Sequence, residues 1–193
     1  MNQTVSYYNE HAEEYCRATA DADMRFCRDK FMSCLSSGAH ILDAGCGSGR
    51  DSKVFMDKGF AVTAMDASEK MCTEAAKLLC QDVLQLSFEK MNFQNEFDGI
   101  WACASLLHVE KSEINSVMKK LKNALKQDGI LYASFKYGTE ERIMQGRLFN
   151  DYDERLLRVL LEDSDFTVCD IFITEDVRKM RQGERWVNAI AKK

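Results

Sequence analysis

The chain of 193 residues is the length of one ordinary domain. It has 26 basic and 31 acidic residues, a net charge of −5, which disfavours nucleic acid or an anionic membrane as its main partner. Neither a signal peptide nor a membrane span is evident, so we expect a cytoplasmic protein. The eight cysteines contain no C-x-x-C pair. We therefore expect no metal site, and reduced cysteines that act as small apolar residues.

The first forty residues have the pattern of helices. Apolar side chains recur at helical spacing from Val5 to Tyr15 and again from Met24 to Leu35, and Gly38 interrupts this pattern. We therefore expect residues 1–38 to form a helical cap.

From His40 onward, strands and helices alternate, which predicts a mostly parallel sheet with helices on both faces. Ser68, Ser112 and Asp153 are the residues expected to begin three of these helices. The expected strands are 41–44, 60–65, 78–80, 97–103, 130–135, 167–173 and 186–191. Ligands of such sheets bind at the carboxyl ends of the strands.

A glycine-rich turn follows the first expected strand. Residues 43–51 read D-A-G-C-G-S-G-R-D, and Asp66 ends the next strand, nineteen residues after Gly47. Glycines let the backbone turn sharply and approach a ligand, and a carboxylate at this distance can accept both hydroxyls of an adenosine ribose.

Two cofactors suit this arrangement, NAD and S-adenosylmethionine. The dinucleotide pattern G-x-G-x-x-G has Arg50 in place of its third glycine here. A pyrophosphate also favours a helix N-terminus without carboxylates, whereas Asp43 and Asp51 flank this loop. Carboxylates suit the sulfonium and ammonium of S-adenosylmethionine, so the sequence favours that methyl donor.

Five segments resemble the motifs of class I S-adenosylmethionine-dependent methyltransferases, particularly the tellurite-resistance and ubiquinone-biosynthesis types. They are residues 41–49, 62–68, 80–83, 97–108 and 121–131. The last lacks the usual proline. The resemblance implies a Rossmann-like, seven-stranded α/β sheet whose last strand is antiparallel. It also implies a single domain, residues 1–193, with a cofactor-binding half (39–137) and an acceptor-side half (138–193).

The resemblance also implies site residues. The loop would line the methionine part of the donor, Asp66 would hold the ribose, and Asp82 would meet the adenine edge unless it is merely a loop carboxylate. Tyr8 and Tyr15 would belong to a lid, although core packing is the alternative for these tyrosines. The cofactor-binding residues implied are Asp43, Ala44, Gly45, Cys46, Gly47, Gly49, Asp66, Ala67, Met71, Asp82, Val83, Ala102, Tyr8 and Tyr15.

Methyl transfer from a sulfonium is an in-line displacement, so the protein mainly aligns the reactants. His108 is the candidate general base, with a structural histidine as the alternative. Arg147, Arg178 and Trp186 are the candidates for binding a carboxylate or phosphate of the acceptor, with ordinary surface residues as the alternative.

The sequence thus predicts a methyltransferase that acts on a small polar or anionic molecule. Three alternatives stay open: a methyltransferase of RNA or protein, a nicotinamide-dependent oxidoreductase, and a non-catalytic module that binds the methyl donor. The sequence leaves the acceptor and the oligomeric state undetermined.

Overall fold

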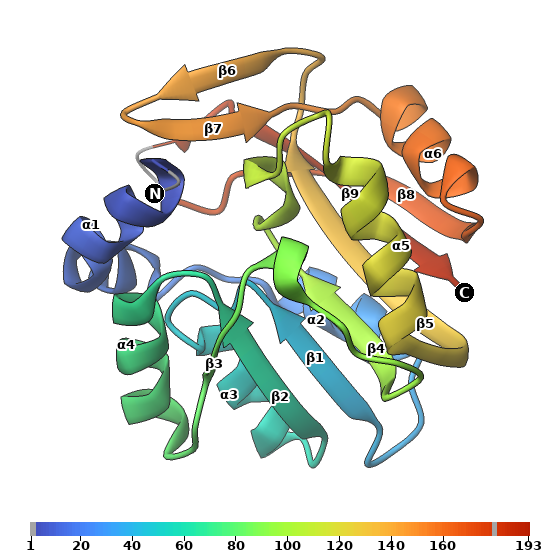
Figure 1. Cartoon of the computed structure of the whole chain (residues 1–193), viewed down its shortest axis with the longest axis horizontal. Helices are drawn as coiled ribbons and strands as arrows, with labels where there is room; N and C mark the ends of the chain where they lie inside the picture. Colours follow the sequence, from blue (N-terminus) through green and yellow to red (C-terminus); the bar gives the residue numbers. More distant parts are fainter. Residues whose placement is uncertain (1–2, 179–180) are drawn as a thin grey trace.

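The computed structural model describes residues 3–178 and 181–193 and is built on one twisted sheet (Figure 1). In the described residues this sheet has seven strands, in the order β3-β2-β1-β4-β5-β9-β8. They are β3 (Leu84–Gln85), β2 (Ala61–Asp66), β1 (His40–Ala44), β4 (Phe97–Ala102), β5 (Leu125–Lys136), β9 (Arg185–Lys192) and β8 (Thr167–Glu175). Neighbours from β3 to β5 pair in parallel, and β9 pairs antiparallel with both β5 and β8.

Helices cover both faces of this sheet because side chains alternate along each strand. Ile41, Trp101 and Tyr132 pack against α2 (Arg25–Met32) and α3 (Arg50–Asp57). Their neighbours Leu42 and Ile100 face the opposite side, where α5 (Ile114–Ala124) and α6 (Glu154–Asp163) bury their apolar faces. The predicted Rossmann-like fold, with its mostly parallel seven-stranded sheet and antiparallel last strand, is confirmed.

Two of the three predicted helix starts are confirmed. Ser68 caps α4 (Glu69–Leu79), its hydroxyl accepting from the amide of Met71, and Asp153 caps α6 in the same way. The prediction for Ser112 is wrong, since α5 follows Glu113 and no side chain caps it.

The predicted strand at 78–80 is also wrong. Helix α4 continues through Leu79, and Cys80 adopts a left-handed conformation with φ of 52° that ends it. Leu79 packs on Ala75 of the same helix, so the short apolar run belongs to the helix. Periodicity alone does not separate these two cases. The third strand, β3, lies four residues further on.

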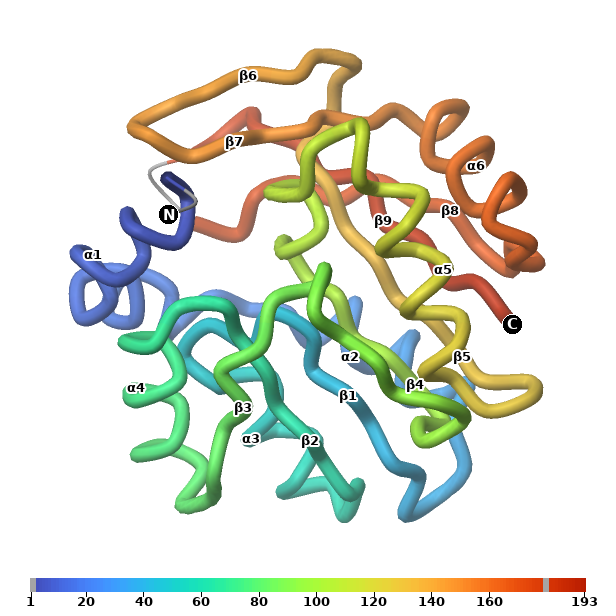
Figure 2. Tube along the Cα trace, in the orientation of Figure 1, coloured from blue at the N-terminus to red at the C-terminus, as the bar shows by residue number. Residues whose placement is uncertain are grey.

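The predicted cap of residues 1–38 divides into two parts. Helix α1 (Gln3–Thr19) contacts α4 and β7 (Arg147–Asn150), so it lies at the carboxyl ends of the strands. Figure 2 shows that the hairpin of β6 (Glu141–Met144) and β7 runs over the same end. Helix α2, in contrast, packs on the sheet. None of the described helices is long and apolar enough to cross a membrane.

Candidate active site

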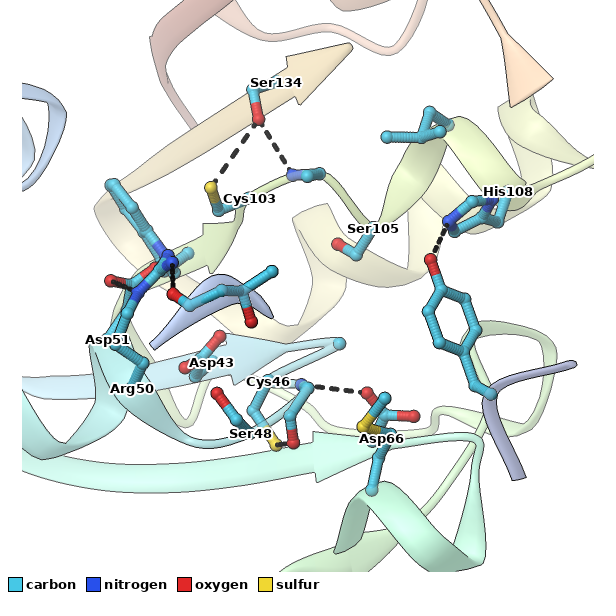
Figure 3. Close-up of a pocket in the computed structure, with 18 of the residues that line it drawn as sticks. Asp43, Cys46, Ser48, Arg50, Asp51, Asp66, Cys103, Ser105, His108 and Ser134 are labelled. Carbon is cyan, nitrogen blue, oxygen red and sulfur yellow. Dashed lines mark hydrogen bonds and ion pairs between the residues drawn. The ribbon is translucent and has the colours of Figure 1, made fainter. Parts of the chain in front are cut away.

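A cavity of about 630 Å³ lies at the carboxyl ends of β1, β2, β4 and β5. Its wall contains two groups of residues, and Figure 3 labels Asp43 and Asp66 of the first group and His108 of the second. The loop region comprises Asp66, at the end of β2, Asp43 near the end of β1, and residues 45–48 of the turn that follows β1. The cap region comprises Tyr8 of α1, His108 of the short 3-10 helix η2 (Leu106–His108), and Arg147 of β7.

The glycine turn is fixed against the neighbouring strand ends. Gly45, Gly47 and Gly49 have φ values of 84°, 54° and 77°, which glycine adopts without steric cost. A Cβ on Gly45 would lie 2.4 Å from the Cβ of Ser105, whose hydroxyl donates to the carbonyl of Ala44 at 2.7 Å. No side chain therefore fits at Gly45 without moving the loop.

Asp66 joins the glycine turn to the start of α4. Its Oδ2 accepts from the amide of Gly47 at 3.0 Å, and its Oδ1 accepts from the amide of Ser68 at 2.9 Å. Burial raises the pKa of this carboxyl above its ordinary value, against the effect of these amides. Each carboxylate oxygen keeps lone pairs for further donors, such as the hydroxyls of a ligand.

Asp43 is a buried carboxyl on the wall of the same region. The hydroxyl of Ser52 donates to its Oδ2 at 2.6 Å. Burial, reinforced by the nearby Asp51, raises the pKa of Asp43 to about 7. Its charge therefore changes near neutral pH.

Asp51, the other carboxylate that flanks the glycine turn, is already neutralised by basic groups. It forms ion pairs with Arg28 at 2.6 Å and Arg50 at 2.9 Å, and Trp101 Nε1 donates to it at 3.2 Å. Burial opposes ionisation here, but the two guanidinium groups prevail and hold the pKa of Asp51 below its ordinary value. The expectation that Asp51 attracts a cationic cofactor is therefore wrong.

In the cap region, His108 links two segments that are distant in sequence. Its Nδ1 lies 2.6 Å from the carbonyl oxygen of Leu148, and its Nε2 lies 2.9 Å from the hydroxyl of Tyr8. A carbonyl only accepts, so Nδ1 carries the proton and Nε2 accepts from Tyr8. Burial lowers the pKa of His108 to about 4, and the charge of Arg147 adds to this shift. The imidazole is neutral at pH 7.

Arg147 is buried beside this pair with 6% of its surface exposed. Its Nη2 donates to the side chain of Gln145 at 2.9 Å, and its guanidinium lies 4.2 Å from the centroid of the Tyr7 ring. Its Nε has no hydrogen-bond partner, and no carboxylate of the described residues forms an ion pair with it.

Arg178 and Trp186 also line the cavity, but their donors are engaged by Asp176. Arg178 forms a two-point contact with Asp176 at 2.8 and 2.6 Å, and Trp186 Nε1 donates to it at 3.1 Å. The buried Lys136 pairs with the same carboxylate at 2.9 Å. These contacts position both side chains within the wall of the cavity.

The structure brings most of the predicted site residues together. Those on the cavity wall are Tyr8, Tyr15, Asp43, Gly45, Cys46, Gly47, Asp66, Ala67, Met71, His108, Arg147, Arg178 and Trp186. Ala44 and Ala102 are fully buried in the main core. Gly49 precedes α3, and a Cβ there would lie 3.2 Å from atoms of Ala75 and Leu79. These three residues support the wall from behind.

The structure corrects the prediction that Asp82 and Val83 lie at the adenine edge. Both precede β3, whereas the cavity lies at the carboxyl ends of the strands, and neither lines it. Asp82 is exposed, and Val83 packs against the cluster around Ala75. Because the expected strand was placed too early in the chain, its carboxyl end was misplaced too. The residues that follow β3 on the cavity wall are 86–90.

Sequence reasoning missed two polar residues of β5 that reach the cavity. Ser134 accepts from the amide of Ala104 at 2.8 Å, and the buried Lys136 lies 4.3 Å from the centroid of the Trp186 ring. Both are polar residues near the carboxyl end of a buried apolar strand. That position in an otherwise apolar run was the available signal.

Comparison with known sequences identifies the central part of the chain. Residues 41–129 match the family described as a methyltransferase domain. An inferred methyltransferase of Geobacillus sp. (strain WCH70) is 31% identical over 151 residues, which cover 72% of this chain and 60% of that protein. The chain thus spans less than two thirds of that relative.

Solved structures share the fold along nearly the whole chain. The 1,6-didemethyltoxoflavin-N1-methyltransferase of Burkholderia thailandensis, crystallised with 1,6-didemethyltoxoflavin and S-adenosylhomocysteine, superposes with a TM-score of 0.85 at 22% identity, covering 99% of this chain and 87% of that one. A TehB-like S-adenosylmethionine-dependent methyltransferase of Corynebacterium glutamicum gives 0.75 at 20% identity, covering 95% and 99%. Residues 41–129 thus match a methyltransferase domain, and the chain shares the fold of these two methyltransferases.

Proposed function

We propose that this chain binds S-adenosylmethionine in the loop region and transfers its methyl group to a small polar or anionic molecule held in the cap region. The observation that carries this proposal is the pairing of Asp66 with the Gly47 amide beside a turn that admits no side chain at Gly45. A nucleoside can approach such a backbone closely while its ribose hydroxyls donate to the carboxylate.

The charge of the loop region favours this donor over a dinucleotide. Asp43 and Asp66 line the cavity, and neither forms an ion pair with a described residue. A pyrophosphate would meet these carboxylates unfavourably, whereas an ammonium and a sulfonium would be stabilised by them. The residues present therefore fit the methyl donor.

The loop region and two residues that follow Asp66 have distinct roles in this proposal. Asp66 binds the ribose, Asp43 lies near the ammonium, and Ala67 and Met71 pack on the adenine. When bound, the donor supplies a methyl group already activated on sulfur. The chain's own contribution is to align the acceptor and to exclude water, which α1 and the β6–β7 hairpin do by lying at this end of the sheet.

In the cap region, we assign His108 to positioning rather than to proton removal. Both of its nitrogens are engaged, and its pKa of about 4 leaves it neutral. It accepts the hydrogen bond of the Tyr8 hydroxyl and so positions this side chain on the cavity wall. An acceptor that enters as an anion needs no general base.

A small acceptor is supported by the place of the cap region inside a cavity between α1 and the β6–β7 hairpin. The structural relative from Burkholderia thailandensis was crystallised with 1,6-didemethyltoxoflavin and S-adenosylhomocysteine. A methyltransferase of RNA or protein would use an open, basic surface, which the net charge of −5 disfavours.

Calorimetry and isotope transfer test this proposal together. Titration with S-adenosylhomocysteine should show saturable binding, and titration with NAD should show none. Labelled methyl donor should then label small molecules in a metabolite extract and leave RNA and protein pools unlabelled. Binding of NAD alone, or label in the polymer pools alone, would contradict the proposal. Donor binding without any transfer would point to a non-catalytic module.

A further inference from the structure

Arg147 differs from the other buried cations of this protein. Arg28 and Lys136, at 8% and 5% exposure, each pair with a buried carboxylate, Asp51 and Asp176 respectively. Arg147 is equally buried, yet its Nε has no partner and no described carboxylate pairs with it. A buried charge without a counter-ion is strongly unfavourable, so its retention calls for an anion that pairs with it.

The surroundings of Arg147 are neutral and already organised. Tyr7 and Phe149 place their rings 4.2 and 5.2 Å from the guanidinium, and Gln145 holds Nη2. The hydroxyl of Tyr8 donates to the neutral His108, so this pair adds no charge beside Arg147. Aromatic faces and neutral hydrogen-bond acceptors support a cation without neutralising it.

This proposal rests on the function proposed above and narrows it. We propose that the methyl acceptor is a small, planar molecule carrying a single negative charge, and that its anionic group pairs with the guanidinium of Arg147 beside the ring of Phe149.

The groups around Arg147 explain why we expect the methyl acceptor to carry a single negative charge. The five residues named around Arg147 carry no charge at pH 7: they are Tyr7, Tyr8, His108, Gln145 and Phe149. The basic residues Lys136 and Arg178, further along the cavity wall, are paired with Asp176. A dianion such as a phosphate monoester would keep one buried charge unpaired, which disfavours it. The planar guanidinium fork suits a carboxylate or a delocalised anion.

The test uses simple probes and thermal unfolding of the whole chain at pH 7.5 and constant ionic strength. Benzoate is the planar monoanion, benzamide its neutral counterpart, and inorganic phosphate the more highly charged anion. Because a ligand that binds the folded state stabilises it, benzoate should raise the Tm by about 2 °C or more. Benzamide and phosphate should leave the Tm unchanged.

Arg147→Met is the decisive variant, and Arg142→Met is its control. Arg142 lies on the same hairpin and contacts the same Phe149 ring, but it pairs with Asp151. We expect benzoate to lose about 30-fold or more in affinity for Arg147→Met and to keep its affinity for Arg142→Met. Should Arg147→Met fail to fold, Arg147→Gln gives the same comparison.

Several outcomes would overturn the proposal: no benzoate shift in the parent protein, an equal shift with benzamide, a larger shift with phosphate, or an undiminished shift in the Arg147 variant. S-adenosylhomocysteine affinity, measured on the same samples, should be unchanged in Arg147→Met. A protein that binds benzoate through Arg147 but not S-adenosylhomocysteine would refute the proposed function and leave the anion site in place.

Discussion

The loop region and the cap region share one cavity but differ in how they are built. The residues of the loop region lie close together in the sequence, between 43 and 66, and their contacts are mostly to backbone amides. The cap region joins Tyr8, His108 and Arg147, which are distant in sequence and meet through side chains. A backbone cradle suits one constant ligand, whereas side chains on separate elements can vary with the acceptor.

The largest expected effect concerns the glycine turn itself. Gly45→Ala would place a Cβ 2.4 Å from Ser105 Cβ and strain a φ of 84°. We expect the affinity for S-adenosylhomocysteine to fall about 100-fold, because the turn must shift away from the cavity. Calorimetry measures this directly.

Gly59→Ala is the matched control for that change. Its φ of 89° imposes the same backbone strain, but a Cβ there meets nothing within 4 Å. It should lower the Tm and leave donor affinity intact. Equal losses of affinity in the two variants would mean that strain, and not the close fit at Ser105, governs the site.

Next in size is the loss expected at the ribose carboxylate. Asp66→Asn keeps the shape of the side chain but removes its charge, so donor affinity should fall about 30-fold. Asp82→Asn is the control, since Asp82 is exposed and does not line the cavity. Undiminished affinity in Asp66→Asn, or a comparable loss in Asp82→Asn, would remove the basis of the loop assignment.

Substitutions in the cap region should lower acceptor turnover and leave donor affinity unchanged. Tyr8→Phe removes the hydroxyl that donates to His108 at 2.9 Å. We expect kcat/KM for the acceptor found in the extract to fall about tenfold, with donor affinity unchanged. Tyr7→Phe, which keeps the ring against Arg147, should have little effect. A fall in donor affinity alone would show that the two regions are not separate.

Donor affinity should also depend on pH, with a change of comparable size, because of Asp43 in the loop region. The pKa of Asp43 is raised to about 7, so the proton occupies the free protein below that pH. The cationic donor favours the carboxylate, so its affinity should rise about tenfold between pH 6 and pH 8. Asp43→Asn should flatten this profile. A profile that falls with pH, or that persists in the variant, would contradict the role of Asp43.

The contrast between the two regions also explains how far the sequence could predict them. The glycine turn and Asp66 were found because their spacing is local, between two well-formed strands. The adenine edge was misplaced because β3 has only two residues, Leu84 and Gln85, and gives no periodic signal. Asp82 was the nearest carboxylate in sequence and lies at the wrong end of the strand.

Ion pairs between residues that are distant in sequence could not be predicted from the sequence. Asp51 was expected to attract a cation, and nothing local revealed that Arg28 from α2 would neutralise it. Arg147 and Arg178 had the same appearance in the sequence. The fold distinguishes them, because Asp176 pairs with Arg178 whereas the described residues offer Arg147 no carboxylate.

A crystal structure with S-adenosylhomocysteine tests the division of the cavity most directly. The ribose hydroxyls should lie within hydrogen-bond distance of the Asp66 carboxylate, with the sulfur directed toward Tyr8 and Arg147. A nucleoside bound against Arg147, or a ribose out of reach of Asp66, would contradict the assignment of the two regions.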